Sequence, residues 1–184
     1  MGNFFVNKIE GVQIVDSPAF IDSRGSSTKI IDSVNSLGLA EIDSLLLSRN
    51  TFKGTVRGLH FQVSPNSESK IVTCLTGEVV DYLVDLRPNS KTFGRWSKNI
   101  LDASKPSALI VPKGVAHGYQ TLKPETSILY GIDAQYNPDH QVVLSVFDSE
   151  LSIRLELEIS HISDRDMQGI SLQDAMVLTQ STST

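Results

Sequence analysis

Residues that could carry chemistry first appear in the segment "GTVRGLHFQ", residues 54–62, which has a single residue between His60 and Gln62. The segment is typical of a short strand, so both side chains are expected to project from one face. Lys70 follows eight residues later, and "PKGVAH" adds His117 directly after a tight glycine turn. Histidine is a common general base and an ammonium group stabilises a developing oxyanion, so these residues predict proton-transfer chemistry.

The order of these residues is similar to the two motifs of the cupin jelly roll, with the usual metal-ligand positions changed. Where a metal-binding cupin has a second histidine and a glutamate, this chain has Gln62 and Lys70. A neutral amide is a poor ligand for iron or zinc, and an ammonium group repels a divalent cation. We therefore predict a site without a metal, in which Lys70 stabilises an oxyanion.

A histidine base together with an oxyanion stabiliser suggests abstraction of a proton next to a carbonyl. Tyr130, in "ILYGID", is a candidate proton donor from the opposite face. Asp166, in "SDRD", is a candidate partner for the distal nitrogen of His60, where it would hold one tautomer. Structural roles stay open for both, because Tyr130 suits a core strand and Asp166 suits a cap or a pair with Arg165.

The segment of residues 69–88 predicts a β-hairpin of two apolar strands around Gly77. In such a hairpin Asp81 would bond Lys70 across the two strands, although an ordinary strand charge is an equal alternative. Lys70 could likewise be a plain edge-strand charge, but its register with His60 favours a functional role. Gln62 and Asp81 are both predicted to belong to the substrate-binding set.

The rest of the chain consists of short, alternating, β-rich blocks separated by Gly, Pro, Asn and Asp. This pattern predicts an all-β fold, a cupin jelly-roll barrel with a few short helices. A turn of helix is expected within residues 33–42, a C-terminal helix after a Ser171 cap, and a disordered tail from about residue 179. Because no linker or repeat is visible, residues 1–184 are expected to form a single domain.

The bulk composition excludes several classes of protein. With a net charge of −5, no basic surface dominates, so neither nucleic acid nor an anionic membrane is an expected partner. Cys74 is the only cysteine, so an internal disulfide and a cysteine-based metal site are both excluded. No signal peptide or membrane-spanning segment is visible in the sequence, and a cytoplasmic location is expected.

The chain resembles the dTDP-4-dehydrorhamnose 3,5-epimerases and related sugar-nucleotide epimerases over roughly residues 10–175. Any one of the shared motifs would be weak evidence, but together they keep the order and spacing of the family. These motifs are "DSRG", "VRGLHFQ", "SKIVTCLTGEVVDYLVDLR", "TFGRW", "PKGVAHGY", "LYGIDAQYNP" and "ISDRD". The resemblance implies a jelly-roll homodimer without cofactor or metal, in which a strand of one subunit reaches the neighbouring site.

By position, the resemblance implies that His60 is the base, with Asp166 as its partner. It also implies that Tyr130 is the proton donor and that Lys70 stabilises the enolate. The expected substrate is a nucleotide-diphospho-4-keto-6-deoxy sugar, inverted at C3, at C5 or at both.

The resemblance also implies a set of substrate contacts. Arg24, Arg57 and His117 are expected at the diphosphate or the sugar. Tyr136 falls where a ring stacks on the nucleotide base, and Arg165 falls where a basic residue helps to hold the ligand.

Five positions depart from the family pattern, and all belong to substrate or nucleotide recognition. They are Ser27, Lys29, Leu45, Leu47 and Gln141. The proton-transfer residues are unchanged, so we expect the chemistry to be kept and the substrate to differ, with a nucleotide other than dTDP preferred.

Three other functions are alternatives to an epimerase. A non-catalytic jelly-roll module that binds a sugar nucleotide would explain the changed recognition residues but not the retained Lys70 and His60. A 3,4-ketoisomerase is disfavoured by the matches at Tyr130 and Asp166. A metal-dependent cupin oxygenase is excluded at Gln62 and Lys70.

Overall fold

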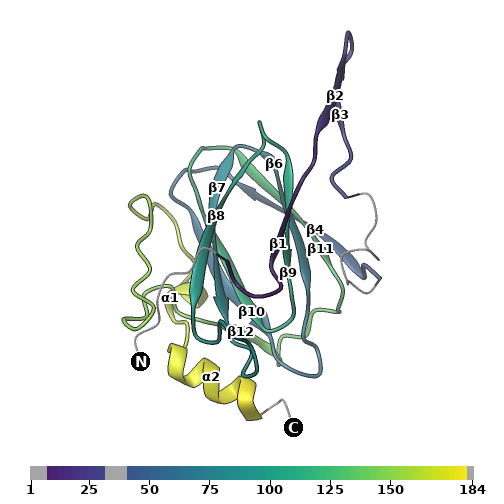
Figure 1. The fold of residues 1–184 in the computed structure, drawn as a ribbon. Coiled ribbons are helices and arrows are strands. Elements are labelled where there is room, and N and C mark those ends of the chain that lie inside the picture. Colours follow the sequence, from purple (N-terminus) through teal and green to yellow (C-terminus); the bar gives the residue numbers. More distant parts are fainter. Residues whose placement is uncertain (1–7, 32–40, 182–184) are drawn as a thin grey trace.

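The computed structural model describes residues 8–31 and 41–181, in which two antiparallel sheets of five strands face each other (Figure 1). The first sheet contains, in spatial order, β1 (Gln13–Asp16), β9 (Ser107–Val111), β6 (Lys70–Thr76), β11 (Thr126–Ile132) and β4 (Ser44–Asn50). The second contains β12 (Gln141–Val143), β5 (Val56–Gln62), β10 (Val115–Thr121), β7 (Glu78–Asp85) and β8 (Trp96–Asp102). The expectation of an all-β jelly-roll fold is confirmed.

A hairpin and two short helices complete the described part of the chain. The hairpin consists of β2 (Ala19–Asp22) and β3 (Gly25–Thr28), and it projects away from the two sheets (Figure 1). The helices are α1 (Asp164–Met167) and α2 (Leu172–Ser181). No helix among the described residues is long and apolar enough to cross a membrane.

The predicted hairpin between β6 and β7 is wrong. The two strands follow each other in sequence, yet β6 pairs with β9 and β11 whereas β7 pairs with β10 and β8. At Gly77 the chain therefore passes from one sheet to the other. Gly77 has φ +80°, and a Cβ at this position would lie 2.2 Å from Thr126 Oγ1, so the corner accommodates glycine alone.

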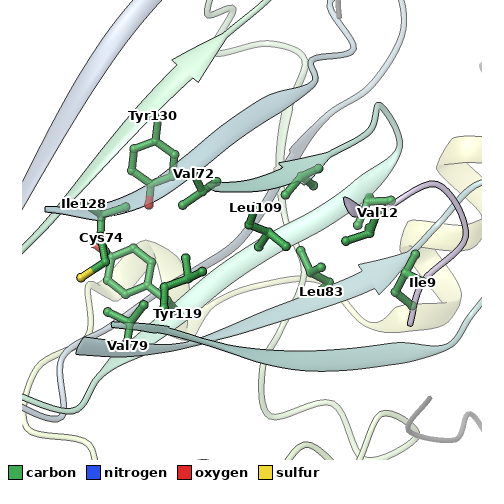
Figure 2. Packing of buried hydrophobic residues seen from close by; sticks show 13 residues of the cluster. Ile9, Val12, Val72, Cys74, Val79, Leu83, Leu109, Tyr119, Ile128 and Tyr130 are labelled. Atoms are coloured by element: carbon green, nitrogen blue, oxygen red, sulfur yellow. The ribbon is translucent and has the colours of Figure 1, made fainter. Parts of the chain in front are cut away.

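The apolar faces of β6 and β7 meet in a cluster that fills the space between the sheets (Figure 2). Val72 and Cys74 contribute from β6, and Val79 and Leu83 contribute from β7. Full burial of such side chains stabilises a fold by about 1.5–3 kcal/mol each. The prediction that Cys74 is a core residue is confirmed, and burial raises the pKa of its thiol to about 11.

Two tyrosines stand on one side of this cluster, whereas Ile9 and Val12 lie on the other side (Figure 2). Tyr119 comes from β10 of the second sheet and Tyr130 from β11 of the first. The core is thus polar at one end, where the functional site lies.

The C-terminal helix begins where the sequence predicts it. Ser171 Oγ accepts a hydrogen bond from the backbone N–H of Asp174 at 3.1 Å, as a helix cap does. The expectation of a disordered tail is corrected for residues 179–181, since α2 continues to Ser181 and the Thr179 side chain is buried. Most of the turn expected within residues 33–42 lies outside the described residues.

Candidate functional site

A cavity of about 460 Å³ opens between the two sheets beside the polar end of the core. Strand β5 supplies Arg57 and His60, and β10 supplies His117. The facing sheet supplies Lys70 from β6 and Tyr130 from β11. These five residues predicted from sequence therefore line one cavity, and they come from four strands of two sheets.

His60 and Asp166 form the predicted pair, with His60 Nε2 and Asp166 Oδ1 2.6 Å apart. Helix α1 presents the carboxylate, because Ser163 caps this helix by accepting a hydrogen bond from the Asp166 backbone N–H at 3.1 Å. Asp166 Oδ2 accepts a second hydrogen bond from the Gly58 backbone N–H at 3.2 Å. The cap of α1 is thus Ser163 rather than Asp166, whose carboxylate bonds His60 and Gly58.

Burial pushes the pKa of Asp166 upward, but the hydrogen bonds from His60 and Gly58 outweigh it and hold the pKa below its ordinary value. The carboxylate is thus ionised at neutral pH and can only accept hydrogen bonds. His60 Nε2 must therefore carry the hydrogen of the pair, which leaves Nδ1 with the free lone pair. This is the arrangement of an oriented general base.

Lys70 is buried at the start of β6, and its ammonium group has two partners. Lys70 Nζ lies 3.0 Å from Glu68 Oε1, and it donates to the backbone oxygen of His60 at 3.2 Å. The predicted hydrogen bond from Lys70 to Asp81 is not formed. The hairpin in which this bond was predicted does not exist, and Glu68 and the His60 carbonyl hold the ammonium group instead.

Asp81 instead pairs with His117, with His117 Nε2 and Asp81 Oδ2 2.5 Å apart. Asp81 Oδ1 is buried and has no hydrogen-bond partner among the described residues. Burial raises the pKa of Asp81, although the nearby His117 opposes this effect. The His117 ring meets Tyr130 edge-on, with ring centroids 5.7 Å apart.

Tyr130 is 8% exposed and lines the cavity from the sheet opposite His60. Burial raises the pKa of Tyr130 well above its usual value, and the neighbouring Tyr119 adds to the effect. The phenol therefore keeps its proton at neutral pH and can donate it. Tyr119 is itself held by Asn50, whose Nδ2 donates to the Tyr119 hydroxyl at 3.1 Å, and Arg57 Nε donates to Asn50 Oδ1 at 2.8 Å.

Gln62 has a different place from the one predicted. It is 2% exposed and is absent from the cavity wall, because it points into the protein beside the loop that follows β5. Its Nε2 donates to Glu68 Oε2 at 3.0 Å, and its Oε1 accepts from the Asn137 backbone N–H at 2.7 Å. The amide is satisfied by protein groups, so we withdraw the predicted substrate contact of Gln62 in favour of a structural role.

The remaining predicted contacts are spread around the molecule. Tyr136 is 60% exposed and lines the cavity. Arg24 lies on the projecting hairpin, where it forms an ion pair with Asp22, and Arg165 is exposed in a separate depression beside α2. The structure of this chain therefore brings neither arginine into the cavity that holds His60.

Sequence reasoning missed the role of Glu68, which lines the cavity and pairs with Lys70. Its position two residues before Lys70 was the available signal, because a buried lysine needs a nearby carboxylate. Gln141 also lines the cavity, and its buried Oε1 has no hydrogen-bond partner among the described residues.

Metal ligands are the last feature of the site. Within residues 8–31 and 41–181, no group of three or more His, Cys, Asp or Glu side chains could hold a metal ion. The two histidines of the cavity each bond a carboxylate instead.

Comparisons with known proteins agree on one family. A family model described as dTDP-4-dehydrorhamnose 3,5-epimerase matches residues 6–174. The protein of that name from Sinorhizobium fredii is 34% identical over 179 residues, a match that covers 94% of this chain and 90% of the relative. The one from Mycobacterium tuberculosis is 37% identical over 124 residues, which cover 66% of this chain but only 61% of that relative's length.

A solved structure extends the likeness to three dimensions. The dTDP-6-deoxy-D-glucose-3,5-epimerase of Legionella pneumophila, in complex with dTDP-4-keto-L-rhamnose, superposes with a TM-score of 0.84 at 30% identity, covering 91% of this chain and 92% of that one. The likeness includes the two facing sheets between which His60, Lys70 and Tyr130 meet. The chain belongs to the dTDP-4-dehydrorhamnose 3,5-epimerase family.

Proposed function

We propose that this chain is an epimerase of a nucleotide-diphospho-4-keto-6-deoxy sugar. The observation that carries the proposal is the meeting of an oriented base, the His60–Asp166 pair, with a protonated phenol, Tyr130, on opposite walls of one cavity. A base on one face and a proton donor on the other are what inversion of a carbon centre requires. Lys70 supplies the cation that an enolate needs.

The reaction follows from the groups present. The C4 ketone acidifies the hydrogens on C3 and C5, and His60 Nδ1 removes one of them as a proton. The electron pair of the broken C–H bond moves to O4, where the Lys70 ammonium stabilises the enolate. Tyr130 or a water then delivers a proton to the other face of the carbon. His60 releases its own proton to solvent, and the tyrosinate or hydroxide left behind takes one up from solvent. The product has the composition of the substrate and one inverted centre.

The nucleotide carrier is a second part of the proposal. The solved relative from Legionella pneumophila holds a dTDP sugar, whereas this chain has Ser27 and Lys29 where the family has an aromatic and an acidic residue. Lys29 cannot accept a hydrogen bond from thymine N3–H, and such a loss costs about 1–3 kcal/mol when the partner is buried. Calorimetric titration with dTDP, CDP, GDP and UDP tests the preference for a carrier other than dTDP. Tightest binding of dTDP would contradict it.

We further propose that the chain acts as a homodimer with exchanged hairpins. Arg24 lies far from its own cavity on the projecting hairpin, whose Phe20 and Ile21 are 72% and 80% exposed (Figure 1). The edge strand β4 also exposes three consecutive leucines, Leu45, Leu46 and Leu47. Apolar surface on a projecting hairpin and beside the cavity suits a second copy of the chain.

The expected cytoplasmic location stays a prediction from sequence.

Solvent deuterium exchange tests the proposed reaction. The purified protein is incubated in D₂O with dTDP-4-keto-6-deoxyglucose, or with the same sugar on the tightest-binding nucleotide. NMR spectroscopy should show deuterium entering at C3, at C5 or at both. Exchange at one carbon alone would identify a mono-epimerase. Binding without exchange would instead support the non-catalytic module, and migration of the ketone to C3 would support the 3,4-ketoisomerase.

A further inference from the structure

Glu68 is a carboxylate of the cavity to which the proposed reaction assigns no step. It lies two residues before Lys70, and Glu68 Oε1 is 3.0 Å from Lys70 Nζ. The two side chains are only 7% and 8% exposed. A buried ammonium group is costly unless a carboxylate compensates it, so this contact holds the Lys70 side chain in place.

The other oxygen of Glu68 is held as firmly. Gln62 Nε2 donates to Glu68 Oε2 at 3.0 Å, and Gln62 is itself fixed through its contact with the Asn137 backbone N–H. The carboxylate is therefore bonded at one oxygen to a side chain of β5 and at the other to Lys70. Rotation of Glu68 away from Lys70 would break both contacts.

Glu68 also limits what Lys70 can do. A lysine ammonium group has three N–H donors. Among the described residues, Glu68 Oε1 and the backbone oxygen of His60 engage two of them. Because the three N–H bonds have fixed tetrahedral directions, fixing two of them fixes the third. The third N–H is the one left for a ligand in the cavity.

We propose that Glu68 is a positioning residue, which holds the Lys70 ammonium so that its remaining N–H meets the substrate oxygen that becomes the enolate. The inference rests on the proposed epimerisation for the identity of that oxygen. Glu68 itself exchanges no proton with the substrate. Its effect on the reaction passes through Lys70.

The test combines kinetics with a direct view of the ammonium group. Glu68→Ala should lower kcat by about tenfold to a hundredfold, because small displacements of a catalytic group have effects of that order, while KM stays within about threefold. Glu68→Gln keeps the shape and one acceptor oxygen, so it should lose less. Glu78→Gln is the matched control, since Glu78 forms an ion pair with Lys123 and does not line the cavity.

The ammonium group is followed by ¹⁵N–¹H NMR spectroscopy of the protein without ligand. A Lys70 ammonium held in this way should give a signal protected from exchange with water, which Lys70→Met identifies by its disappearance. We expect Glu68→Ala to abolish the signal and Glu68→Gln to weaken it. Circular dichroism checks that each variant is folded, and Glu68→Gln carries the test if Glu68→Ala is not.

Several outcomes would overturn the inference. The first is a parental kcat in folded Glu68→Ala, or in Glu68→Gln if Glu68→Ala does not fold. The second is a loss of kcat with an unchanged ammonium signal. The third is the absence of any protected Lys70 signal in the parent. A parent that exchanges no deuterium on any nucleotide sugar would refute the proposed function instead. In that case the NMR signal still decides whether Glu68 holds Lys70.

Discussion

The two histidines of the cavity are each bonded to an aspartate, but their environments differ. The side chain of His60 is 30% exposed, whereas that of His117 is 3% exposed. Asp166 has a lowered pKa because its hydrogen bonds outweigh burial, whereas burial raises the pKa of Asp81. A base must reach its substrate and needs an ionised partner, so the pair of His60 is suited to proton abstraction. The pair of His117 is suited to holding a ligand or a neighbouring side chain.

Replacement of His60 is the first prediction. A positioned general base contributes about 10²–10⁴-fold, so His60→Ala should lower the rate of deuterium exchange into the sugar by that factor while the fold is kept. The control is His161→Ala, since His161 is exposed and stacks on Phe52 outside the cavity. Exchange at the parental rate in His60→Ala would identify another residue as the base.

The second prediction concerns the pH dependence of stability at Asp166. Its folded-state pKa is lowered, so its contribution to stability is complete above the ordinary carboxyl pKa and is lost as the pH falls through the folded value. Asp166→Asn should therefore be less stable than the parent at about pH 6, and the difference should shrink on acidification to about pH 3. Urea unfolding across this range measures it. A difference that grows on acidification would show that the sign is wrong.

At the scale of elements, the pairing of β10 with β5 places His117 directly opposite His60. The corner at Gly77 instead separates two consecutive strands, because it places β6 and β7 in facing sheets. Lys70 on β6 can therefore face the histidines across the cavity rather than lie beside them. Two strand connections thus set the relative positions of the base and the cation.

The third prediction tests the corner at Gly77. A left-handed backbone costs a residue with a side chain about 1–2 kcal/mol, and a Cβ here would also clash with Thr126. Gly77→Ala should therefore lower the free energy of unfolding by more than this amount. Gly11→Ala is the matched control, since Gly11 has φ +76° but its nearest neighbour to a Cβ is 3.4 Å away. Equal losses in the two variants would show that the corner tolerates a side chain.

At the scale of the whole molecule, the projecting hairpin is the feature whose exposed side chains have no evident role within a single chain. Arg24 is held by Asp22 at its tip, and Phe20 and Ile21 are exposed beside it. In a two-fold dimer each hairpin could supply Arg24 to the cavity of the partner. The functional unit would then be two chains, each incomplete alone.

The fourth prediction tests this exchange by complementation. Arg24→Ala and His60→Ala should each be weakly active alone, but a mixed dimer would contain one site with both residues. Refolding the two variants together should restore about a quarter of the parental activity, because half of the dimers are mixed and each has one complete site. Mixing His60→Ala with Tyr130→Phe is the control, since both residues line the same cavity. No recovery in verified dimers would place Arg24 outside the site.

The chemistry-bearing residues, the β class and the family could all be predicted from the sequence. Four residues stand at recognisable positions in short motifs, namely His60, Lys70, Tyr130 and Asp166. The spacing within each motif can be read from the sequence because local strand geometry sets it. The pairing of His60 with Asp166 across 106 residues was expected through the family resemblance, and the structure brings the two side chains to 2.6 Å.

Which strands are neighbours could not be predicted from the sequence and became known from the fold. Alternation of side chains defines the two faces of a strand but does not say which sheet the strand joins, so β6 and β7 were expected to pair with each other. The partners of Asp81, the inward position of Gln62 and the burial of Glu68 against Lys70 all depend on that choice. The Asp81–His117 contact joins neighbouring strands of the second sheet, whereas Lys70 reaches the His60 carbonyl only when the two sheets close on each other, and no local pattern records either arrangement.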